Sequence, residues 1–339
     1  GAMATTRAVR SKSTKKPAPH PVEGRSLVGL AELEASLIRR LLARTTEMHA
    51  VLEKGGTRSL AGRIVANLFF EDSTRTRTSF SVAAKRLGAD VVDLMGFASS
   101  VNKGETLVDT ALNVEAMGVD ALVIRAKQSG AADAISQAVN CPVISGGDGR
   151  HEHPTQGLLD TYTLAEAHAR LKDFDLEGLR VLIVGDVASS RVARSAITGM
   201  SKLGAEVVCI GPPGLAPGGL ESLGCTVAHD LDAHLRGADA IMMLRMQFER
   251  HDAEGEGAKG GERKSSVIAS VREYRQGYAL TAARASRLAA GCVVMHPGPM
   301  NRGIEIDGEV ADSARSVILR QVTNGVAVRM AVLSWCLEG

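Results

Sequence analysis

The sequence predicts an α/β fold made of two doubly wound parallel-sheet domains that are joined by interdomain helices. Short, almost wholly apolar segments such as 179–185 alternate with longer segments of helical periodicity, which is typical of parallel strands covered by helices on both faces. These segments form two series, and the second starts at Leu179. The 339-residue chain has 45% apolar but only 3% aromatic residues, which favours tightly packed α/β layers over an all-β sandwich.

The first series predicts four strands and the helices around them. The strands are expected near residues 63–70, 90–95, 120–125 and 141–145, with helices near residues 30–53 and 75–88 and further helices between the later strands. A helix from about Pro154 to Ala169 would join the two halves. The second series predicts a strand from Leu179, further strands near residues 206–210, 239–244 and 292–296, and a long closing helix near residues 315–337.

These elements predict a first domain over residues 25–157, a second over residues 158–312, and a C-terminal helix, 313–339, that packs back on the first domain. Residues 1–24 are expected to form a disordered basic tail, since five lysines and arginines precede the first acid and three prolines break any helix. Its first two residues, before Met3, indicate a cloning remnant. A transit peptide is the alternative, although the tail lacks an amphipathic apolar face.

Charge and cysteine content exclude several classes of protein. The net charge of +2 indicates neither a nucleic-acid footprint nor an acidic tail, and no apolar run approaches the roughly 18 residues needed to cross a bilayer. The five cysteines are scattered, mostly within apolar runs, and none forms a CxxC pair. They indicate buried thiols of a reducing compartment, so we expect a cytoplasmic protein without a disulfide framework or a zinc site.

The most informative segment is 69–80, where the first predicted strand leads directly into a helix start. Backbone N–H groups at such a start lack intrahelical partners, and three hydroxyls and one guanidinium converge there: Ser73, Thr74, Thr76 and Arg75. This combination predicts a phosphate site. The alternative is an ordinary helix cap with arginines on a solvated face. No GxxxxGK[ST] loop occurs, so a P-loop nucleotide is not expected.

Other polar clusters also follow predicted strands, where open parallel sheets bind their ligands. They are Arg125, the segment 151–156 (His-Glu-His-Pro-Thr-Gln), Arg191, Arg245 with Gln247, and the segment 296–299 (His-Pro-Gly-Pro). Any one of these arginines or histidines alone is more often a surface or structural residue. Five clusters in succession, with at least four arginines and no matching acids, predict a substrate pair that carries phosphate and carboxylate groups.

Two other kinds of site fit the sequence less well. The turn after the strand from Leu179 lacks the GxGxxG spacing of a dinucleotide site, which occurs only at 255–260 inside a charged loop. His151 and His153 could ligate a metal with Glu152, but no further ligands stand at metal spacing. The glycine-rich loop 254–264 has no apolar face and is expected to be a mobile surface segment, either a lid or an inert insertion.

From about residue 25 to 338 the sequence resembles the aspartate/ornithine carbamoyltransferase family. The motifs 73–77 (Ser-Thr-Arg-Thr-Arg) and 153–156 (His-Pro-Thr-Gln) are strong signals of that family. Segments 245–247 (Arg-Met-Gln) and 296–299 are similar to its aspartate branch, because the ornithine branch typically carries Ser-Met-Gly and His-Cys-Leu-Pro. The resemblance implies transfer of the carbamoyl group of carbamoyl phosphate to L-aspartate, a step of pyrimidine biosynthesis, with no metal or cofactor.

The resemblance also implies roles for the matching residues. The phosphate would be held by Ser73, Thr74, Arg75 and Thr76. The carbamoyl group would face Arg125, His153 and Gln156, and its nitrogen would contact the backbone of Gly298 and Pro299. The aspartate carboxylates would be bound by Arg191, Arg245 and Gln247. Charge on the carbonyl oxygen would be stabilised by Thr76, Arg125 and His153.

Further expectations concern assembly and closure. Ser99 and Lys103 match a loop that family members insert into a neighbouring subunit's site, which implies a homotrimer with shared active sites. A dihydroorotase or a regulatory chain is a further partner that the sequence leaves open. Some relatives carry leucine in place of Gly298, with little expected consequence because the backbone makes the contact. We also expect Glu71 to pair with Arg191 or Arg250 when the domains close.

Overall fold

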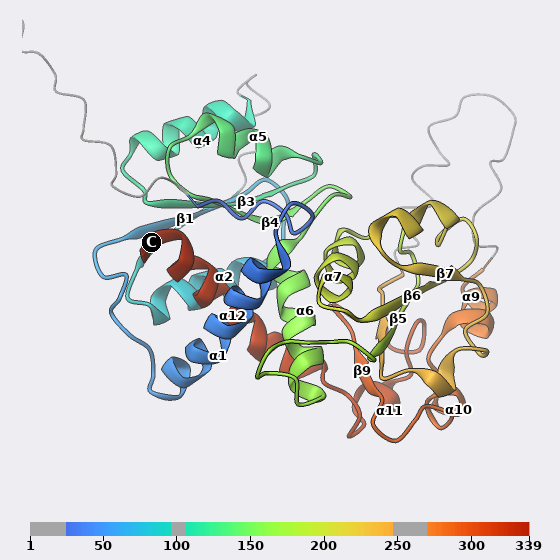
Figure 1. Ribbon diagram of the computed structural model, residues 1–339. Helices are drawn as coiled ribbons and strands as arrows, with labels where there is room; N and C mark the ends of the chain where they lie inside the picture. Colours follow the sequence, from blue (N-terminus) through green and yellow to red (C-terminus); the bar gives the residue numbers. More distant parts are fainter. Residues whose placement is uncertain (1–24, 96–105, 247–269, 339) are drawn as a thin grey trace, which may run out of the picture.

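The structure is a computed structural model that describes residues 25–95, 106–246 and 270–338. It contains two parallel sheets, one in each half of the molecule, with helices packed against both faces (Figure 1). The strand order is β2-β1-β3-β4 in the first sheet and β7-β6-β5-β8-β9 in the second. The predicted fold class is therefore confirmed.

The first half contains one sheet and the helices around it. Its elements are α1 (Ala35–Glu53), β1 (Ile64–Phe69), α2 (Thr74–Arg86), β2 (Asp90–Met95), α4 (Leu107–Ala116), β3 (Ala121–Ala126), α5 (Ala131–Ala138) and β4 (Val143–Asp148). Helix α1 begins later than predicted. The backbone N–H groups of Leu30 and Ala31 instead donate to the Glu152 carboxylate, each at 3.1 Å.

The connecting helix and the second half follow. They comprise α6 (Pro154–Ala167), β5 (Arg180–Val184), α7 (Arg191–Lys202), β6 (Glu206–Ile210), η1 (Gly218–Leu223), β7 (Thr226–Ala228), η2 (Leu235–Gly237), β8 (Ala240–Met243), α9 (Val271–Tyr278), α10 (Ala282–Ala285), β9 (Val293–Met295), α11 (Gly308–Ala311) and α12 (Ile318–Glu338). Strand β7 was not predicted, because it is a three-residue edge strand with little periodicity to detect.

Each sheet has a switch point at its centre. The chain leaves β1 towards β2 and then continues on the other side with β3, and it repeats this pattern around β5 with β6 and β8. All pairings between these strands are parallel, so their carboxyl ends lie at one edge of each sheet. Ligands of open α/β sheets bind outside such edges, at the switch points.

Helix α6 is the structural link between the halves, and residues 154–165 are all buried. It packs against α7 with almost no side chain between them, because a Cβ at Gly157 would lie 2.7 Å from Ser195, and one at Gly199 would lie 2.6 Å from the Thr161 hydroxyl. The glycines are therefore required for this close approach.

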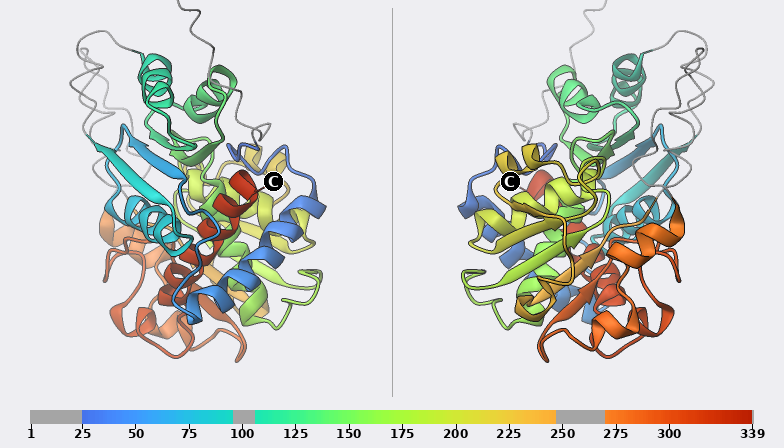
Figure 2. Two further views of the ribbon diagram at one scale, coloured as in Figure 1. Left: turned by 90° about the vertical axis from the view of Figure 1, so that its left-hand side faces the viewer. Right: turned by 90° about the vertical axis from the view of Figure 1, so that its right-hand side faces the viewer.

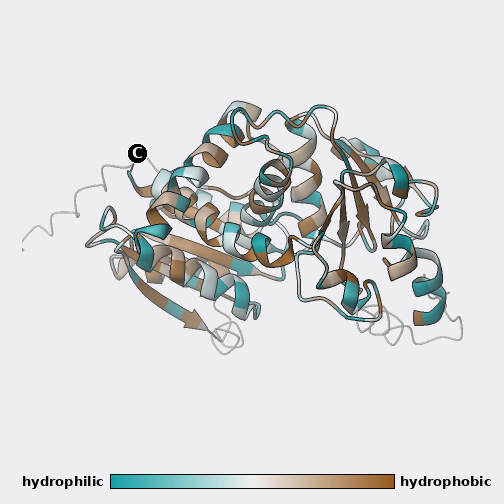
Figure 3. Cartoon of the chain, turned by 90° about the horizontal axis from the view of Figure 1, so that it is seen from below, coloured by the Kyte–Doolittle hydropathy of each residue, from teal (hydrophilic) through white to brown (hydrophobic). Residues whose placement is uncertain are grey.

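Helix α12 returns to the first half and contacts α1, α2 and α6 (Figure 2). One apolar cluster runs from the first sheet through α6 and α12 to the second sheet and includes Val65, Leu158, Val181 and Val328. The strands of both sheets are correspondingly apolar (Figure 3). The two halves therefore share a continuous core, which fixes the edges of the two sheets relative to each other.

Two further observations bear on the expected setting of the protein. None of the helices in the described ranges is both long and apolar enough to span a membrane. All five cysteines lie in described parts of the chain, and each is buried and free of any disulfide.

Candidate active site

A cavity of about 610 Å³ opens at the carboxyl ends of both sheets and is lined by residues from both halves. Eleven of the fourteen predicted site residues line it: Ser73, Thr74, Arg75, Thr76, Arg125, His153, Gln156, Arg191, Arg245, Gly298 and Pro299. The other three, Ser99, Lys103 and Gln247, lie outside the described residues, as do Arg250 and the glycine-rich loop. Segments far apart in the sequence thus meet at one cavity, while the role of each residue stays a prediction.

The start of α2 forms one wall of the cavity. Ser73 occupies the N-cap position, but its hydroxyl makes no capping hydrogen bond, and no acidic residue lies in the first helical turn. The first-turn N–H groups therefore keep their capacity to bind an anion, and the helix dipole favours negative charge there. The capping alternative is right about the position of Ser73 but not about its hydroxyl.

Two arginines from different halves meet at Glu71. Arg191, the first residue of α7, donates to the Glu71 carboxylate at 3.0 Å and to the carbonyl oxygen of Gly149 at 3.2 Å. Arg125, near the end of β3, has its Nε 3.8 Å from the same carboxylate and donates to the Gly146 carbonyl at 2.9 Å. The expected contact between Glu71 and Arg191 is therefore present.

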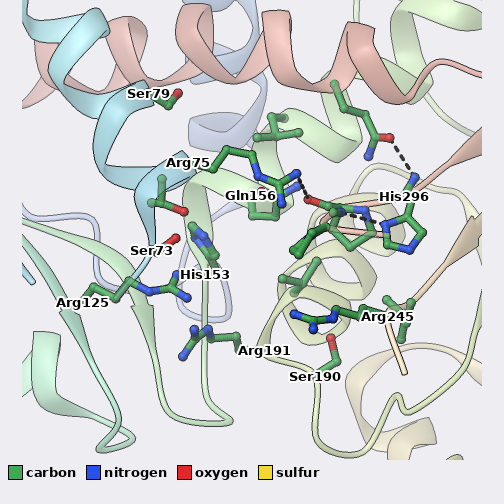
Figure 4. A pocket seen from close by; sticks show the side chains of 18 of the residues that line it. Ser73, Arg75, Ser79, Arg125, His153, Gln156, Ser190, Arg191, Arg245 and His296 are labelled. Atoms are coloured by element: carbon green, nitrogen blue, oxygen red, sulfur yellow. Dashed lines mark hydrogen bonds between the residues drawn. The ribbon is translucent and has the colours of Figure 1, made fainter. Parts of the chain in front are cut away.

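A third arginine reaches across the cavity in the opposite direction. Arg75 of α2 directs its guanidinium towards the turn after β9 and donates to the Pro297 carbonyl at 3.4 Å (Figure 4). A Cβ at Gly298 would collide with that guanidinium, and Gly298 has a φ of +69°. The expectation that a side chain at position 298 has little consequence is therefore wrong for this structure, because it would displace Arg75.

The turn that contains Gly298 is stabilised by hydrogen bonds with buried side chains. Nδ1 of His296 accepts the backbone N–H of Gly298 at 2.8 Å, so the ring proton of the neutral imidazole is assigned to Nε2. Nε2 then donates to Glu305 at 3.0 Å, and the same carboxylate accepts the N–H of Asn301 at 2.6 Å. His296 is thus a support of the turn, and the peptide bond between Gly298 and Pro299 is cis.

His153 lies at the start of α6 between these arginines (Figure 4). Burial, reinforced by the nearby positive charges of Arg125, Arg329 and Arg191, holds the pKa of His153 well below its usual range. The ring is therefore neutral at physiological pH. Its backbone N–H donates to the Ser195 hydroxyl at 2.9 Å, and that hydroxyl in turn donates to Glu152. Nδ1 is buried and has no hydrogen-bond partner within the described chain.

The cavity-lining residues beyond the predicted set include Ser79, Gln321 and Arg329. Arg329 of α12 is buried, donates to the Ser79 hydroxyl at 2.9 Å and lies 5.1 Å above the Phe80 ring. Burial lowers its pKa to about 10, so it still carries its charge at neutral pH. The available sequence signal was an arginine, Arg329, within the most apolar stretch of the closing helix.

The charge balance of the described wall favours anionic ligands. Five arginines line the cavity against three carboxylates, and one of these carboxylates, Glu71, is already engaged by Arg191. Arg245 follows β8 and faces the same space as Ser190 at the start of α7 (Figure 4). Guanidinium groups placed at two switch points can hold two anionic groups side by side.

His151, considered above with His153 as a metal-binding pair, does not line the cavity. Its Nδ1 lies 3.3 Å from Asp148, and its side chain is about half exposed, at 48%. Across the described residues, no group of three or more histidines, cysteines or acids is arranged to hold a metal ion.

Two family models match nearly the whole described chain. Residues 25–166 match the carbamoyl-phosphate-binding domain of the aspartate/ornithine carbamoyltransferases, and residues 177–336 match their aspartate/ornithine-binding domain. An aspartate carbamoyltransferase catalytic subunit from Myxococcus xanthus is 51% identical over 312 residues, which cover 92% of this chain and 99% of that protein. One from Kineococcus radiotolerans is 52% identical over 321 residues, covering 93% and 98%.

Solved structures show the same relationship. Aspartate transcarbamoylase from Trypanosoma cruzi in complex with carbamoyl phosphate superposes with a TM-score of 0.80 at 29% identity, covering 92% of this chain and 95% of that one. Ornithine carbamoyltransferase from Pyrococcus furiosus gives a TM-score of 0.78 at 27% identity, covering 93% and 98%. The matched domains, the relatives at about half identity and the shared architecture together place this chain in the aspartate/ornithine carbamoyltransferase family.

Proposed function

We propose that the protein transfers the carbamoyl group of carbamoyl phosphate to the α-amino group of L-aspartate, giving N-carbamoyl-L-aspartate and phosphate. The observation that carries this proposal is the meeting of an uncapped helix start and four arginines from both switch points, Arg75, Arg125, Arg191 and Arg245, at one cavity. Relatives at 51% and 52% identity are named as catalytic subunits of aspartate carbamoyltransferase, which supports the aspartate branch.

In the proposed mechanism the start of α2 binds the phosphate through backbone N–H groups, hydroxyls and Arg75. This placement brings the carbonyl carbon near Arg125 and His153, where negative charge develops on the carbonyl oxygen during attack. Each pre-positioned donor to such an oxygen typically contributes about 3–4 kcal/mol. A neutral His153 can donate one hydrogen bond there without serving as the base.

The amine of L-aspartate is the nucleophile, and Arg191 and Arg245 are positioned to hold its two carboxylates. The bond between the amine nitrogen and the carbonyl carbon forms as the bond from that carbon to the phosphate oxygen breaks, and the departing phosphate accepts the amine proton. Fixing two anions in this relative orientation removes much of the entropic cost of a bimolecular reaction. The side chains therefore act mainly by orientation and electrostatic stabilisation.

The direct test is turnover with defined substrates. Purified protein supplied with carbamoyl phosphate and L-aspartate should form carbamoyl aspartate and phosphate in equal amounts. L-Ornithine is the matched control, because its side chain carries an ammonium group that Arg191 and Arg245 would repel. A calorimetric titration with an analogue that joins a phosphonate to aspartate should show binding that competes with both substrates. Absence of both turnover and analogue binding would overturn the proposal.

The proposal includes a homotrimer in which Ser99 and Lys103 enter a neighbouring subunit's site, supported by the family resemblance of that segment. Mixing inactive Arg75→Ala and Lys103→Ala proteins under subunit exchange should restore part of the activity, since some sites would then contain both native residues. No restoration would contradict sharing. We further propose a cytoplasmic setting, supported by five buried cysteines without disulfides. A dihydroorotase or regulatory-chain partner stays a prediction.

A further inference from the structure

We propose that Asp160 is a positioning residue, which fixes the orientation of the Gln156 amide towards the substrate and, through Gln321, holds the turn 296–299 against the cavity. Asp160 does not line the cavity, whereas Gln156, Gln321 and the turn do. The inference rests on the proposed carbamoyl transfer and assigns to that site a support that spans both halves of the molecule.

The geometry places one carboxylate oxygen between two amides. Oδ1 of Asp160 accepts from Nε2 of Gln156 at 3.0 Å and from Nε2 of Gln321 at 2.8 Å. Gln156 and Asp160 lie one turn apart on α6, while Gln321 comes from α12. Oε1 of Gln321 then accepts the backbone N–H of His296 at 2.9 Å, at the start of the turn (Figure 4).

The orientation of each amide follows from its partners. The N–H of His296 can only donate, so Gln321 must turn Oε1 towards it and Nε2 towards Asp160. Oδ1 of Asp160 acts as an acceptor both in the carboxylate and in an acid protonated on Oδ2, so Gln156 must also present Nε2 to it. This leaves Oε1 of Gln156 as the group offered to a ligand. An acceptor at that point complements the NH₂ of a carbamoyl group. If the Gln156 amide were flipped, its own NH₂ would face the NH₂ of the carbamoyl group, and no hydrogen bond could form.

Burying the Asp160 carboxylate costs free energy, which its hydrogen bonds to the two amides must offset. Asp160 is 0% exposed, and its Oδ2 has no hydrogen-bond partner among residues 25–95, 106–246 and 270–338. Burial raises the pKa of Asp160 to about 7, although the amides of Gln321 and Gln156 and the charge of Arg329 partly oppose this rise. A leucine would fill a similar volume without desolvating a carboxylate. The acid therefore contributes through its contacts with the two amides and not through packing.

The test compares Asp160→Leu, which removes the acceptor at similar volume, with Asp160→Asn, which keeps an oxygen that can accept both amides. Affinities for carbamoyl phosphate and for inorganic phosphate are measured by competition, together with kcat and KM. Asp160→Leu should weaken carbamoyl phosphate binding about tenfold and leave phosphate binding within about twofold, because only the former ligand meets the Gln156 amide. Asp160→Asn should restore the wild-type ratio of the two affinities within about threefold.

A second comparison isolates the route of the effect. In a Gln156→Ala background, Asp160→Leu should change the ratio of affinities much less than in the wild-type background. Should Asp160→Leu fail to fold, Gln321→Met, which removes the donor to Asp160 and the acceptor for His296, should shift the ratio in the same direction. A thermal melt of each variant separates loss of fold from loss of orientation.

The outcomes distinguish this inference from the proposed function. A wild-type protein that prefers phosphate over carbamoyl phosphate and forms no product would overturn the function. An active wild-type protein with an unchanged ratio in Asp160→Leu, or with equal weakening of both ligands, would overturn only the positioning role. If Asp160→Asn weakened carbamoyl phosphate binding as much as Asp160→Leu does, the positioning role would also be contradicted. The charge of Asp160, and not its shared acceptor oxygen, would then determine the affinity.

Discussion

The two helix starts that face the cavity, α2 in the first half and α7 in the second, differ in how they use their caps. Each follows the strand at the switch point of its sheet, β1 or β5, and each has a serine at the N-cap position. The hydroxyl of Ser190 accepts the N–H of Ala193 at 3.1 Å, whereas the hydroxyl of Ser73 makes no such bond. The first helix start therefore remains open to a ligand, and the second is closed by its own side chain.

The two helix starts can therefore hold two kinds of anion in different ways. At α2 the donors are backbone groups that the helix fixes in place, which suits a phosphate of constant shape. At α7 the ligand is left to guanidinium groups on long side chains, Arg191 and Arg245, which suit carboxylates at a variable distance. We therefore expect the phosphate end of the site to be pre-organised and the aspartate end to adjust.

The largest expected effect comes from removing the guanidinium at the open helix start. Arg75→Ala should lower kcat by about 10³-fold, because a charge that stabilises the leaving phosphate is lost. Arg77→Ala is the matched control, since Arg77 lies on the same helix but does not line the cavity. Product formation and a circular dichroism melt would measure both variants. Activity of Arg75→Ala within about tenfold of wild type would contradict a phosphate-binding role for the start of α2.

The second test concerns Asp160, a buried acid on the connecting helix α6. Burial raises the pKa of Asp160 to about 7, so the folded state binds a proton more tightly than the unfolded state. The stability from this group is present below its unfolded pKa, near 4, and is lost as pH rises through about 7.

Between about pH 4 and pH 7 the wild type should therefore lose up to about 4 kcal/mol of unfolding free energy relative to Asp160→Asn, which has no proton to release. Urea unfolding of both proteins at the two pH values measures the difference. Parallel stability curves would show that Asp160 is not desolvated as described.

The contact across the cavity offers the third test. Gly298→Ala should cost about 1–2 kcal/mol of stability, because Gly298 has a φ of +69°, which a residue with a Cβ adopts unfavourably. The new methyl group should also displace Arg75 from Pro297 and alter the affinity for carbamoyl phosphate. Thermal unfolding and the KM for carbamoyl phosphate check the two effects separately. A fully stable variant with wild-type kinetics would contradict both.

Glu71 joins the two halves by pairing with Arg191 at 3.0 Å while it lies near Arg125. In Glu71→Gln the charge-assisted bond is weakened, so Arg191 should be less well oriented for aspartate. The KM for aspartate should rise about tenfold, and the KM for carbamoyl phosphate should change much less. Equal changes in both constants would show that Glu71 does not act selectively on the aspartate end.

The smallest effects separate the two serines directly. Ser190→Ala should lower stability by about 1 kcal/mol, because a helix cap is lost. Ser73→Ala should leave stability nearly unchanged, since its hydroxyl caps nothing, but should raise the KM for carbamoyl phosphate several-fold. Chemical denaturation and initial rates on both variants provide the measurement. The reverse pattern would mean that the open and closed helix starts have been exchanged.

Much of this architecture could be predicted from sequence because its signals are local. Apolar runs gave the central strands, and the polar residues that follow them in the chain had to lie at the sheet edges where the cavity is found. Arg125, for example, stands opposite Phe69 at the end of the paired strands β1 and β3. Parallel topology alone brings such residues together.

What sequence could not supply depends on contacts between distant segments. Asp160 and Gln321 are single polar residues in helices, and only the packing of α12 against α6 brings them within 2.8 Å. The need for glycine at 298 arises from the position of Arg75, more than 200 residues earlier in the chain. Strand β7 is defined by its pairing with β6 and not by a pattern of its own.

The glycine-mediated contact between α6 and α7 has a consequence for motion during turnover. With Gly157 against Ser195 and Gly199 against Thr161, the two helices run side by side in the same direction and leave no slack in which to slide. The two helices form one rigid pair, with His153 at the start of α6 and Arg191 at the start of α7. Because the two helices cannot slide past each other, their starts keep a fixed separation, and with it the distance between the backbones of His153 and Arg191.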